Sequence, residues 1–383
     1  MSAIDTLRDA LFKPLSIRSL DLPNRVVMSP MTRAASPAGV PGEDVAAYYA
    51  RRAAGGTGLV VTEGVALDHP SSVDASRVPR MHGEEALTGW RSVVDSVHAA
   101  GGRIVPQLWH VGPLWGAMSR VDPAITPMRP SGHWGTPGVT SYPDEYVARS
   151  TPSTAPMTDA DIEAVIAAYV DAARNAVAVG MDGIALHGGH GYLLDAFLWD
   201  DTNTRTDHWG GDQVARSRFP AQVVAEIRRA IGADLPIFFR FSQHKQQDYT
   251  ARLAATPAEL ETVLAPRAEA GVDVFDASAR RFHEPAFAGS DLSLAGWAKK
   301  VTGARSMAVG SVGMGAPLRE SRLAGASESV DNLDEVARRL EAEEFDLIAI
   351  GRLHLADPGL VETLRTGAPL VQFDRPAHEG ALV

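Results

Sequence analysis

The sequence predicts one α/β domain, a (β/α)8 or TIM barrel, and two observations lead to this fold class. Eight short apolar runs, typical of strands that are buried on both faces, recur along the chain. Amphipathic stretches with a helical period lie between them. Eight strands alternating with helices are enough to close a parallel barrel, although an open doubly wound sheet could hold as many units. We therefore expect residues 1–383 to form a single barrel domain.

The predicted strands follow one another along the whole chain: Val26–Met28, Leu59–Thr62, Ile104–Leu108, Ile184–Leu186, Ile237–Phe241, Val272–Phe275, Met307–Val309 and Leu347–Ile350. The clearest predicted helix is Asp159–Val179, because its apolar side chains recur every three or four residues. Thr158 and Asp161 have the spacing of a capping box at its start. Further helices are predicted around Trp90 and from Pro257, a residue favoured at the first helical position.

The segment 109–156 interrupts this alternation. It is rich in Pro, Gly, Ser, Thr and Trp, and it shows no helical period. A loop of this length inside a compact domain is usually functional. It would follow the third strand at the carboxyl face of the barrel, where active sites lie. We therefore expect a lid-like excursion, with a merely structural insertion as the alternative.

Composition and charge exclude several classes of function. The chain has 36 Lys and Arg against 47 Asp and Glu, a net charge of −11, and no Cys. Thiolate nucleophiles, Cys-held iron–sulfur clusters and Cys-based zinc sites are therefore excluded. An acidic chain argues against a nucleic-acid partner. No run of about 18 apolar residues predicts a membrane span, and the N-terminus lacks the apolar core of a secretory signal, so we expect a cytoplasmic protein.

Polar residues follow most of the predicted strands: Thr32, Glu63, Gln107, His187, Arg240, Ser311 and Arg352. In a barrel these positions lie at the catalytic face. Any one of them could be a structural polar group, but their recurrence at successive strand ends indicates a site.

Two of these strand ends indicate a phosphate site. Gly310 and Ser311 follow the seventh strand, and Gly351 and Arg352 follow the eighth. Glycine lets backbone N–H groups approach an anion, and arginine offers a bidentate charged fork. The loops after strands seven and eight form the common phosphate site of TIM barrels. The sequence has neither the G-x-G-x-x-G fingerprint of a dinucleotide fold nor a P-loop motif.

A glycine-rich turn after the fourth strand carries His187, His190 and Tyr192. The two histidines could bind a metal, with His110 and Asp276 as further ligands of a barrel hydrolase. They could instead be hydrogen-bonded within the turn. A third interpretation makes them N–H donors to an anionic oxygen, with Tyr192 as a proton donor beside them. The spacing does not choose among these alternatives.

Four segments, taken in chain order, resemble signatures of the Old Yellow Enzyme family of FMN-dependent ene-reductases: Asn-Arg-Val-Val-Met-Ser-Pro-Met-Thr-Arg at 24–33, Gln-Leu-Trp-His-Val-Gly at 107–112, His-Gly-Gly-His-Gly-Tyr-Leu at 187–193 and Asn-Thr-Arg-Thr-Asp at 203–207. The resemblance continues at 210–211, 216–219 and 351–352, so it covers nearly the whole chain. It implies a single (β/α)8 barrel that binds FMN non-covalently, with no metal.

The resemblance also implies which residues bind the flavin. By position, the residues around the ring are Pro30, Met31, Thr32, Gly64, Gln107 and Arg240, and the phosphate binders are Gly310, Ser311, Gly351 and Arg352. Gln107 can donate and accept at the pyrimidine edge of the ring. The fixed positive charge of Arg240 should favour the reduced flavin. Thr32 stands where another branch of the family has Cys.

The implied activity is a ping-pong reaction. NAD(P)H passes a hydride to flavin N5 and leaves, and a small α,β-unsaturated carbonyl compound then binds in the same space. His187 and His190 would bind the carbonyl oxygen, the hydride would go to the β-carbon, and Tyr192 would protonate the α-carbon. Quinones, nitro compounds or nitrate esters are alternative acceptors. Whether the protein is a monomer or a homo-oligomer stays open.

Two segments depart from the family pattern. Trp209, Asp212 and Ala215 replace the residues common around the glycine pair at 210–211, and we expect Asp212 to cap the helix that follows. The segment 241–248 is rich in charged and amide side chains, unlike the short ending of many members. We expect it to border the entrance for the nicotinamide or the substrate.

Overall fold

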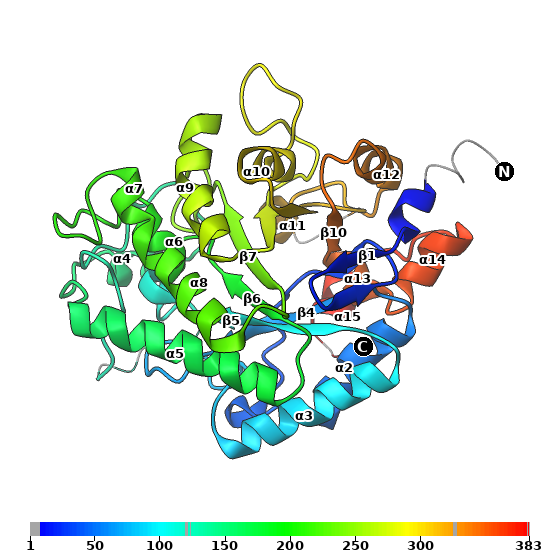
Figure 1. Cartoon of the computed structure of the whole chain (residues 1–383), viewed down its shortest axis with the longest axis horizontal. Helices are drawn as coiled ribbons and strands as arrows, with labels where there is room; N and C mark the ends of the chain where they lie inside the picture. Colours follow the sequence, from blue (N-terminus) through cyan, green and yellow to red (C-terminus); the bar gives the residue numbers. More distant parts are fainter. Residues whose placement is uncertain (1–7, 119–121, 123, 325–327, 381, 383) are drawn as a thin grey trace.

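The computed structural model describes residues 8–118, 122, 124–324, 328–380 and 382. Residues 1–7 of the N-terminal segment and residues 119–121 and 123 of the predicted excursion lie outside this range. The described chain forms one closed barrel of parallel strands in the order β10-β3-β4-β5-β6-β7-β8-β9 (Figure 1). The predicted (β/α)8 fold is therefore confirmed.

The barrel strands match the predicted runs: β3 (Val26–Met28), β4 (Leu59–Ala66), β5 (Ile104–Trp109), β6 (Ile184–His187), β7 (Ile237–Ser242), β8 (Val274–Ser278), β9 (Arg305–Val309) and β10 (Leu347–Ile350). Pairing of β10 with β3, with Ile350 opposite Met28, closes the barrel. Several strands extend beyond their predicted ends because the ladder continues through polar residues. His187 thus lies on β6 itself, as Gln107 and Arg240 lie on β5 and β7 within their predicted runs.

Helices surround the barrel, and Figure 1 shows α3, α5 and α8 outside the strands. The described helices are η1 (Asp9–Phe12), η2 (Pro37–Gly39), α2 (Glu43–Ala54), α3 (Glu84–Ala99), η3 (Gly112–Leu114), α4 (Asp144–Ser150), α5 (Asp159–Ala178), α6 (Leu193–Leu198), α7 (Gln213–Arg216), α8 (Arg218–Ile231), α9 (Pro257–Ala270), α10 (Leu294–Thr302), α11 (Leu318–Ala324), α12 (Leu333–Glu341), α13 (Arg352–Ala356), α14 (Leu360–Thr366) and α15 (Arg375–Glu379). The predicted capping box of Thr158 and Asp161 starts α5. Asp212 caps α7, as expected. None of the helices in the described ranges has the length and apolar character needed to cross a membrane.

A short antiparallel hairpin, β1 (Leu15–Ile17) and β2 (Leu20–Leu22), closes the amino end of the barrel. Its four apolar side chains are buried and share one core cluster with the inward-facing residues of the strands, among them Phe238 and Met307. Burial of apolar surface is the main favourable contribution to folding, so this cluster stabilises the barrel and fills its lower interior. The carboxyl end is left for the site.

The excursion 109–156 contains more regular structure than its sequence indicates. It includes η3 and the short helix α4, whose Tyr146 packs on Trp134 and Tyr142 with ring centroids 6.1 and 4.8 Å apart. The sequence gives no sign of α4, because seven residues are too few to show a helical period. Hydrogen bonds from Gly138 to Gln247 and from Thr140 to Gln246 attach the excursion to the loop after β7.

Candidate active site

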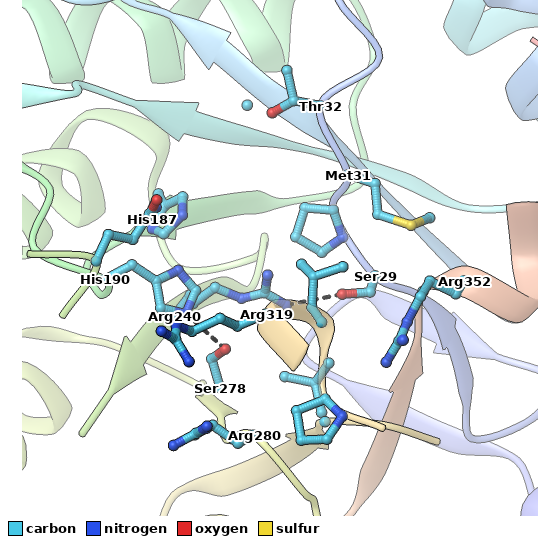
Figure 2. A pocket seen from close by; sticks show the side chains of 18 of the residues that line it. Ser29, Met31, Thr32, His187, His190, Arg240, Ser278, Arg280, Arg319 and Arg352 are labelled. Carbon is cyan, nitrogen blue, oxygen red and sulfur yellow. Dashed lines mark hydrogen bonds between the residues drawn. The ribbon is translucent and has the colours of Figure 1, made fainter. Parts of the chain in front are cut away.

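A cavity of about 600 Å³ opens at the carboxyl end of the barrel. Every residue that the family resemblance assigns to the site lies in its wall: Pro30, Met31, Thr32, Gly64, Gln107, His187, His190, Tyr192, Arg240, Gly310, Ser311, Gly351 and Arg352. In Figure 2, the two histidines and Arg352 lie on opposite sides of this pocket, with Arg240 between them in that view. The closed barrel thus brings together residues that are more than 300 positions apart in the sequence.

Arg240 is held in one orientation by a buried carboxylate. Its Nε atom lies 2.6 Å from Asp276 Oδ2, on the neighbouring strand, and its Nη2 atom donates to Ser29 Oγ at 3.2 Å. Both charged side chains are almost fully buried. Burial raises the pKa of Asp276, and the adjacent guanidinium opposes this shift. Because a buried charge is tolerated only with a partner, the pair fixes a positive charge in the cavity wall.

The same contact removes Asp276 from the ligand set that a metal-dependent hydrolase would need. His110, the other residue considered for that role, is buried beside His69, with 3.4 Å between His110 Nε2 and His69 Nδ1. Across the described ranges, no group of three or more His, Cys, Asp or Glu side chains is placed to hold a metal ion.

The turn after β6 places two histidines side by side. The rings of His187 and His190 have centroids 5.1 Å apart, and His190 Nε2 lies 2.8 Å from Ser278 Oγ. The backbone of His190 has a φ of 63°, and its N–H donates to Ser242 Oγ at 2.8 Å. A left-handed φ is costly for a residue other than glycine, and such strain is typical of functional sites.

Both histidines are neutral at physiological pH. Burial lowers the pKa of each imidazole well below its ordinary value, and the charge of Arg240 lowers both further. A neutral imidazole carries one N–H donor and one acceptor. Within the described part of the chain, the buried Nδ1 atom of His187 has no hydrogen-bond partner.

Tyr192 packs against His187, with ring centroids 4.6 Å apart, and against the edge of Trp109 at 5.0 Å. Burial raises the pKa of its phenol, and a hydrogen bond from Gln246 opposes this shift. The hydroxyl therefore keeps its proton at neutral pH. A protonated phenol beside two neutral imidazoles can give up a proton while the rings donate hydrogen bonds.

Gly64 is required by the packing of Trp109. A Cβ atom at this position would lie 2.3 Å from Cε3 of the indole, far inside contact distance. The absence of a side chain lets Trp109 lie flat against β4 and stack on His187, with ring planes 22° apart. Trp109 was not among the predicted site residues, although it lies within the motif at 107–112.

At the opposite side of the cavity lie the residues predicted to bind phosphate. Ser311 has a φ of 51°, and a Cβ on Gly310 would lie 2.4 Å from a backbone oxygen of Ala279. Arg352 donates to the carbonyl of Ala316 at 2.9 Å. Burial and neighbouring arginines lower the pKa of Arg352 to about 10, so it stays charged at neutral pH. This side of the cavity therefore combines a tight backbone turn with a fixed positive charge.

Glu63 does not face the cavity, contrary to its place among the strand-end residues. Its Oε2 atom accepts hydrogen bonds from the backbone N–H groups of Arg33 and Ala34, both at 2.9 Å. A shift in register between Val61 and Gly64 turns this part of β4. Burial raises the pKa of Glu63 to about 7. The carboxyl group shapes the loop after Thr32.

The sequence assigned no role to several polar and aromatic residues of the wall, among them His244, Gln246, Tyr249, Ser278, Arg280 and Arg319. His244 stacks on Tyr249 with ring planes 11° apart, and the guanidinium of Arg319 lies 5.5 Å from the Tyr249 ring. His244 and Gln246 belong to the departing segment 241–248, so this segment borders the cavity, and its place at the entrance for the nicotinamide or the substrate stays a prediction. The unusual number of polar side chains in segment 241–248 is the sequence feature that could have identified these two residues.

Comparison with known proteins identifies the family. Residues 10–370 match the NADH:flavin oxidoreductase / NADH oxidase family. The chain therefore belongs to the Old Yellow Enzyme family. Flavin oxidoreductase hxnT of Emericella nidulans is 30% identical over 390 aligned residues, which cover 97% of this chain and 95% of that protein. The 12-oxophytodienoate reductase 7 of Oryza sativa subsp. japonica is 37% identical over 237 residues, 58% of this chain and only 56% of that protein.

Solved structures agree with this assignment. Morphinone reductase in complex with tetrahydroNAD has a TM-score of 0.77 and 25% identity, with 96% of this chain and 93% of that chain covered. An old yellow enzyme homologue from Zymomonas mobilis, 23% identical with a TM-score of 0.76, covers 94% of each chain and supports the fold. The protein is thus an NAD(P)H-dependent flavin oxidoreductase, and FMN is its cofactor.

The cavity of this family member fits FMN by the chemistry of its wall. Gln107 Nε2 and His187 Nδ1 are buried polar atoms that find no partner within the described ranges. A buried polar group without a partner costs about 1–3 kcal/mol, so a ligand with a polar edge would satisfy both atoms. Arg240 and Arg352 add fixed positive charges at two separate points, as an electron-accepting ring and a phosphate require.

Proposed function

We propose that this flavin oxidoreductase is an ene-reductase that reduces small α,β-unsaturated carbonyl compounds in a ping-pong reaction. NAD(P)H and the acceptor would occupy the cavity in turn. Bound FMN supplies the chemistry of hydride acceptance and hydride donation. The observation that carries the proposal is the pair of neutral histidines beside the protonated phenol of Tyr192 in one cavity.

His187 and His190 would bind the carbonyl oxygen of the acceptor. As neutral donors they can stabilise the negative charge that develops on this oxygen without being deprotonated themselves. Such preorganised donors act most strongly in a site that excludes water. The hydrogen bonds of His190 with Ser278 and Ser242 support this role because they fix the ring and the backbone before the acceptor arrives.

Tyr192 would supply the proton for the α-carbon. Its ring lies edge-on to His187, so an acceptor held through its carbonyl oxygen would place the adjacent carbon near the phenol. A positioned general acid typically contributes about 10²–10⁴ in rate.

The remaining wall residues would bind the cofactor. Gln107 is proposed to bind the pyrimidine edge of the ring, with Arg240 beside it and with Pro30, Met31, Thr32 and Gly64 forming the adjacent wall. Gly310, Ser311, Gly351 and Arg352 are proposed to bind the phosphate. The excursion 109–156 is proposed as a lid, since its residues Leu114, Met118 and Tyr142 contribute to the wall of the cavity.

A titration with a phenol tests the histidine pair. The phenol should bind as its phenolate at His187 and His190, over the oxidised flavin, and give a long-wavelength charge-transfer band. Replacing both histidines with alanine should abolish the band, and activity should survive chelators. Loss of turnover with EDTA, restored by zinc, would contradict the proposal. Turnover with quinones or nitro compounds but not with enones would show a flavin oxidoreductase that is not an ene-reductase.

A further inference from the structure

Gln246 lies between two tyrosine hydroxyls at the edge of the cavity. Tyr142, on the excursion, donates its O–H to Gln246 Oε1 at 2.6 Å. Gln246 Nε2 donates in turn to the hydroxyl oxygen of Tyr192 at 2.7 Å. All three side chains contribute to the wall of the cavity. The three residues come from different loops, so their contact depends on the fold.

The direction of these bonds determines where the Tyr192 proton can go. An amide has a donor at one end and an acceptor at the other. Because the phenolic oxygen of Tyr192 accepts from Nε2, its own hydrogen is not used in that bond. Among the described residues, Gln246 alone forms a hydrogen bond with this hydroxyl. The O–H can therefore point into the cavity.

The backbone holds Gln246 in this position from both sides. Its N–H donates to the carbonyl of His190 at 3.1 Å, and its own carbonyl accepts from Thr140 Oγ1 at 2.7 Å. The adjacent Lys245 forms a fully buried ion pair with Asp195, at 2.5 Å, and Asp195 also accepts from the N–H of Gly191. The loop that carries Gln246 is thus fixed to the turn that carries Tyr192.

We propose that Gln246 is a positioning residue that directs the Tyr192 proton toward the acceptor, with Tyr142 holding the far end of the amide. This inference rests on the proposed ene-reduction. In that step a new C–H bond forms at the α-carbon from the electron pair of the enolate, and the O–H bond of Tyr192 breaks. The oxygen keeps the bonding pair, and the N–H of Gln246 stabilises the resulting phenolate until solvent returns a proton.

Substitution of Gln246 by leucine or glutamate tests the direction of the bond. Gln246→Leu removes both bonds, so protonation of an enone in the oxidative half-reaction should slow by about 10-fold, as for the loss of one hydrogen bond. Flavin reduction by NAD(P)H and turnover of a quinone should stay nearly normal. Ala255→Glu, a change at an exposed position on the same loop, is the control and should alter neither half-reaction.

Gln246→Glu gives a readout that a merely structural role would not produce. An ionised carboxyl can only accept, so the Tyr192 hydroxyl would donate to it and turn its proton away from the cavity. A protonated carboxyl can donate again. Enone reduction by this variant should therefore rise as the pH falls through the pKa of the introduced group. The wild type and Ala255→Glu should lack this dependence, and a flat profile in Gln246→Glu would overturn the proposal.

A measurement on the FMN-bound protein, without coenzyme or acceptor, separates this inference from the proposed function. With a polyfluorinated tyrosine at position 192, whose phenol is more acidic than that of tyrosine, ¹⁹F NMR reports the titration of that phenol alone. Gln246→Leu should raise its pKa, because the phenolate loses a hydrogen-bond donor, while Ala255→Glu should leave it unchanged. An unmoved pKa in Gln246→Leu would overturn the positioning role even if enones are substrates. A raised pKa in a protein that reduces no enone would instead overturn the ene-reduction step and with it the role in proton delivery.

Discussion

The same strands form an apolar interior at the amino end of the barrel and a polar cavity at its carboxyl end. At the amino end, the hairpin of β1 and β2 packs its leucines and Ile17 against an apolar interior. At the carboxyl end, the same strands present Gln107, His187 and Arg240, and some of the buried polar atoms there find no partner within the described ranges. The comparison indicates that one end supplies stability and the other accepts unfavourable burial so that it can bind a ligand.

The largest effect should come from the polar end. Tyr192→Phe removes one hydroxyl and leaves the ring packed between Trp109 and His187. The oxidative half-reaction with an enone should slow by about 10²–10⁴, the usual contribution of a positioned general acid. Reduction of the flavin by NAD(P)H should be nearly normal, and quinone reduction should suffer far less. Stopped-flow traces that show equal slowing of both half-reactions, or of neither, would mean that the proton comes from elsewhere.

The apolar end should respond in stability and not in chemistry. Leu22→Ala truncates a side chain that is 2% exposed at the closed end of the barrel. Such a truncation in a core costs about 2–5 kcal/mol in the free energy of unfolding. Denaturant unfolding should show this loss, while both half-reactions keep their rates under native conditions. A selective loss of enone reduction in this variant would contradict the view that the amino end contributes stability alone.

A third test addresses the cofactor. Arg352→Ala removes a charge from the side of the cavity opposite the histidines and should weaken FMN binding by about 1.5–3 kcal/mol, the worth of a charge-assisted hydrogen bond. The ratio of flavin to protein absorbance after dilution and gel filtration measures the retention. Full flavin occupancy of the dilute variant would count against the phosphate assignment.

The smallest effect should be the pH dependence that Glu63 causes. Burial raises its pKa in the folded protein to about 7, from an ordinary value of 4.5, so the folded state binds more protons than the unfolded state between these two pH values. Stability should therefore fall as the pH rises from about 4.5 to about 7, by about 1–3 kcal/mol. Glu63→Gln should flatten this slope in urea titrations. An unchanged slope would show that the carboxyl group does not titrate in this range.

The sequence predicts the barrel and the composition of the site well, for a physical reason. Apolar runs mark parallel strands, and in a barrel the residues at their ends converge whatever their distance along the chain. Arg240 and Ser311 could thus be placed in one cavity. The hairpin was missed because each of its strands has only three residues, too few for a period of two to appear.

Other features depend on contacts that no sequence pattern records. The contact between Tyr142 and Gln246 joins residues 104 positions apart, through an excursion without a strong period. Glu63 follows a strand as a catalytic residue would, but a local shift in register turns it toward the backbone of Arg33. Asp276 was considered as a metal ligand, and only the pairing of β7 with β8 places it opposite Arg240.

Isotope labelling tests the central claim, ene-reduction at the polar end of the barrel, most directly. The purified enzyme would be given NAD(P)H and 2-cyclohexenone, once with deuterium on the hydride-donating carbon of the coenzyme in ordinary water and once with unlabelled coenzyme in D₂O. We predict saturated ketone with deuterium at the β-carbon in the first experiment and at the α-carbon in the second. Coenzyme oxidation without saturated ketone, or an alcohol that keeps the double bond, would contradict the account.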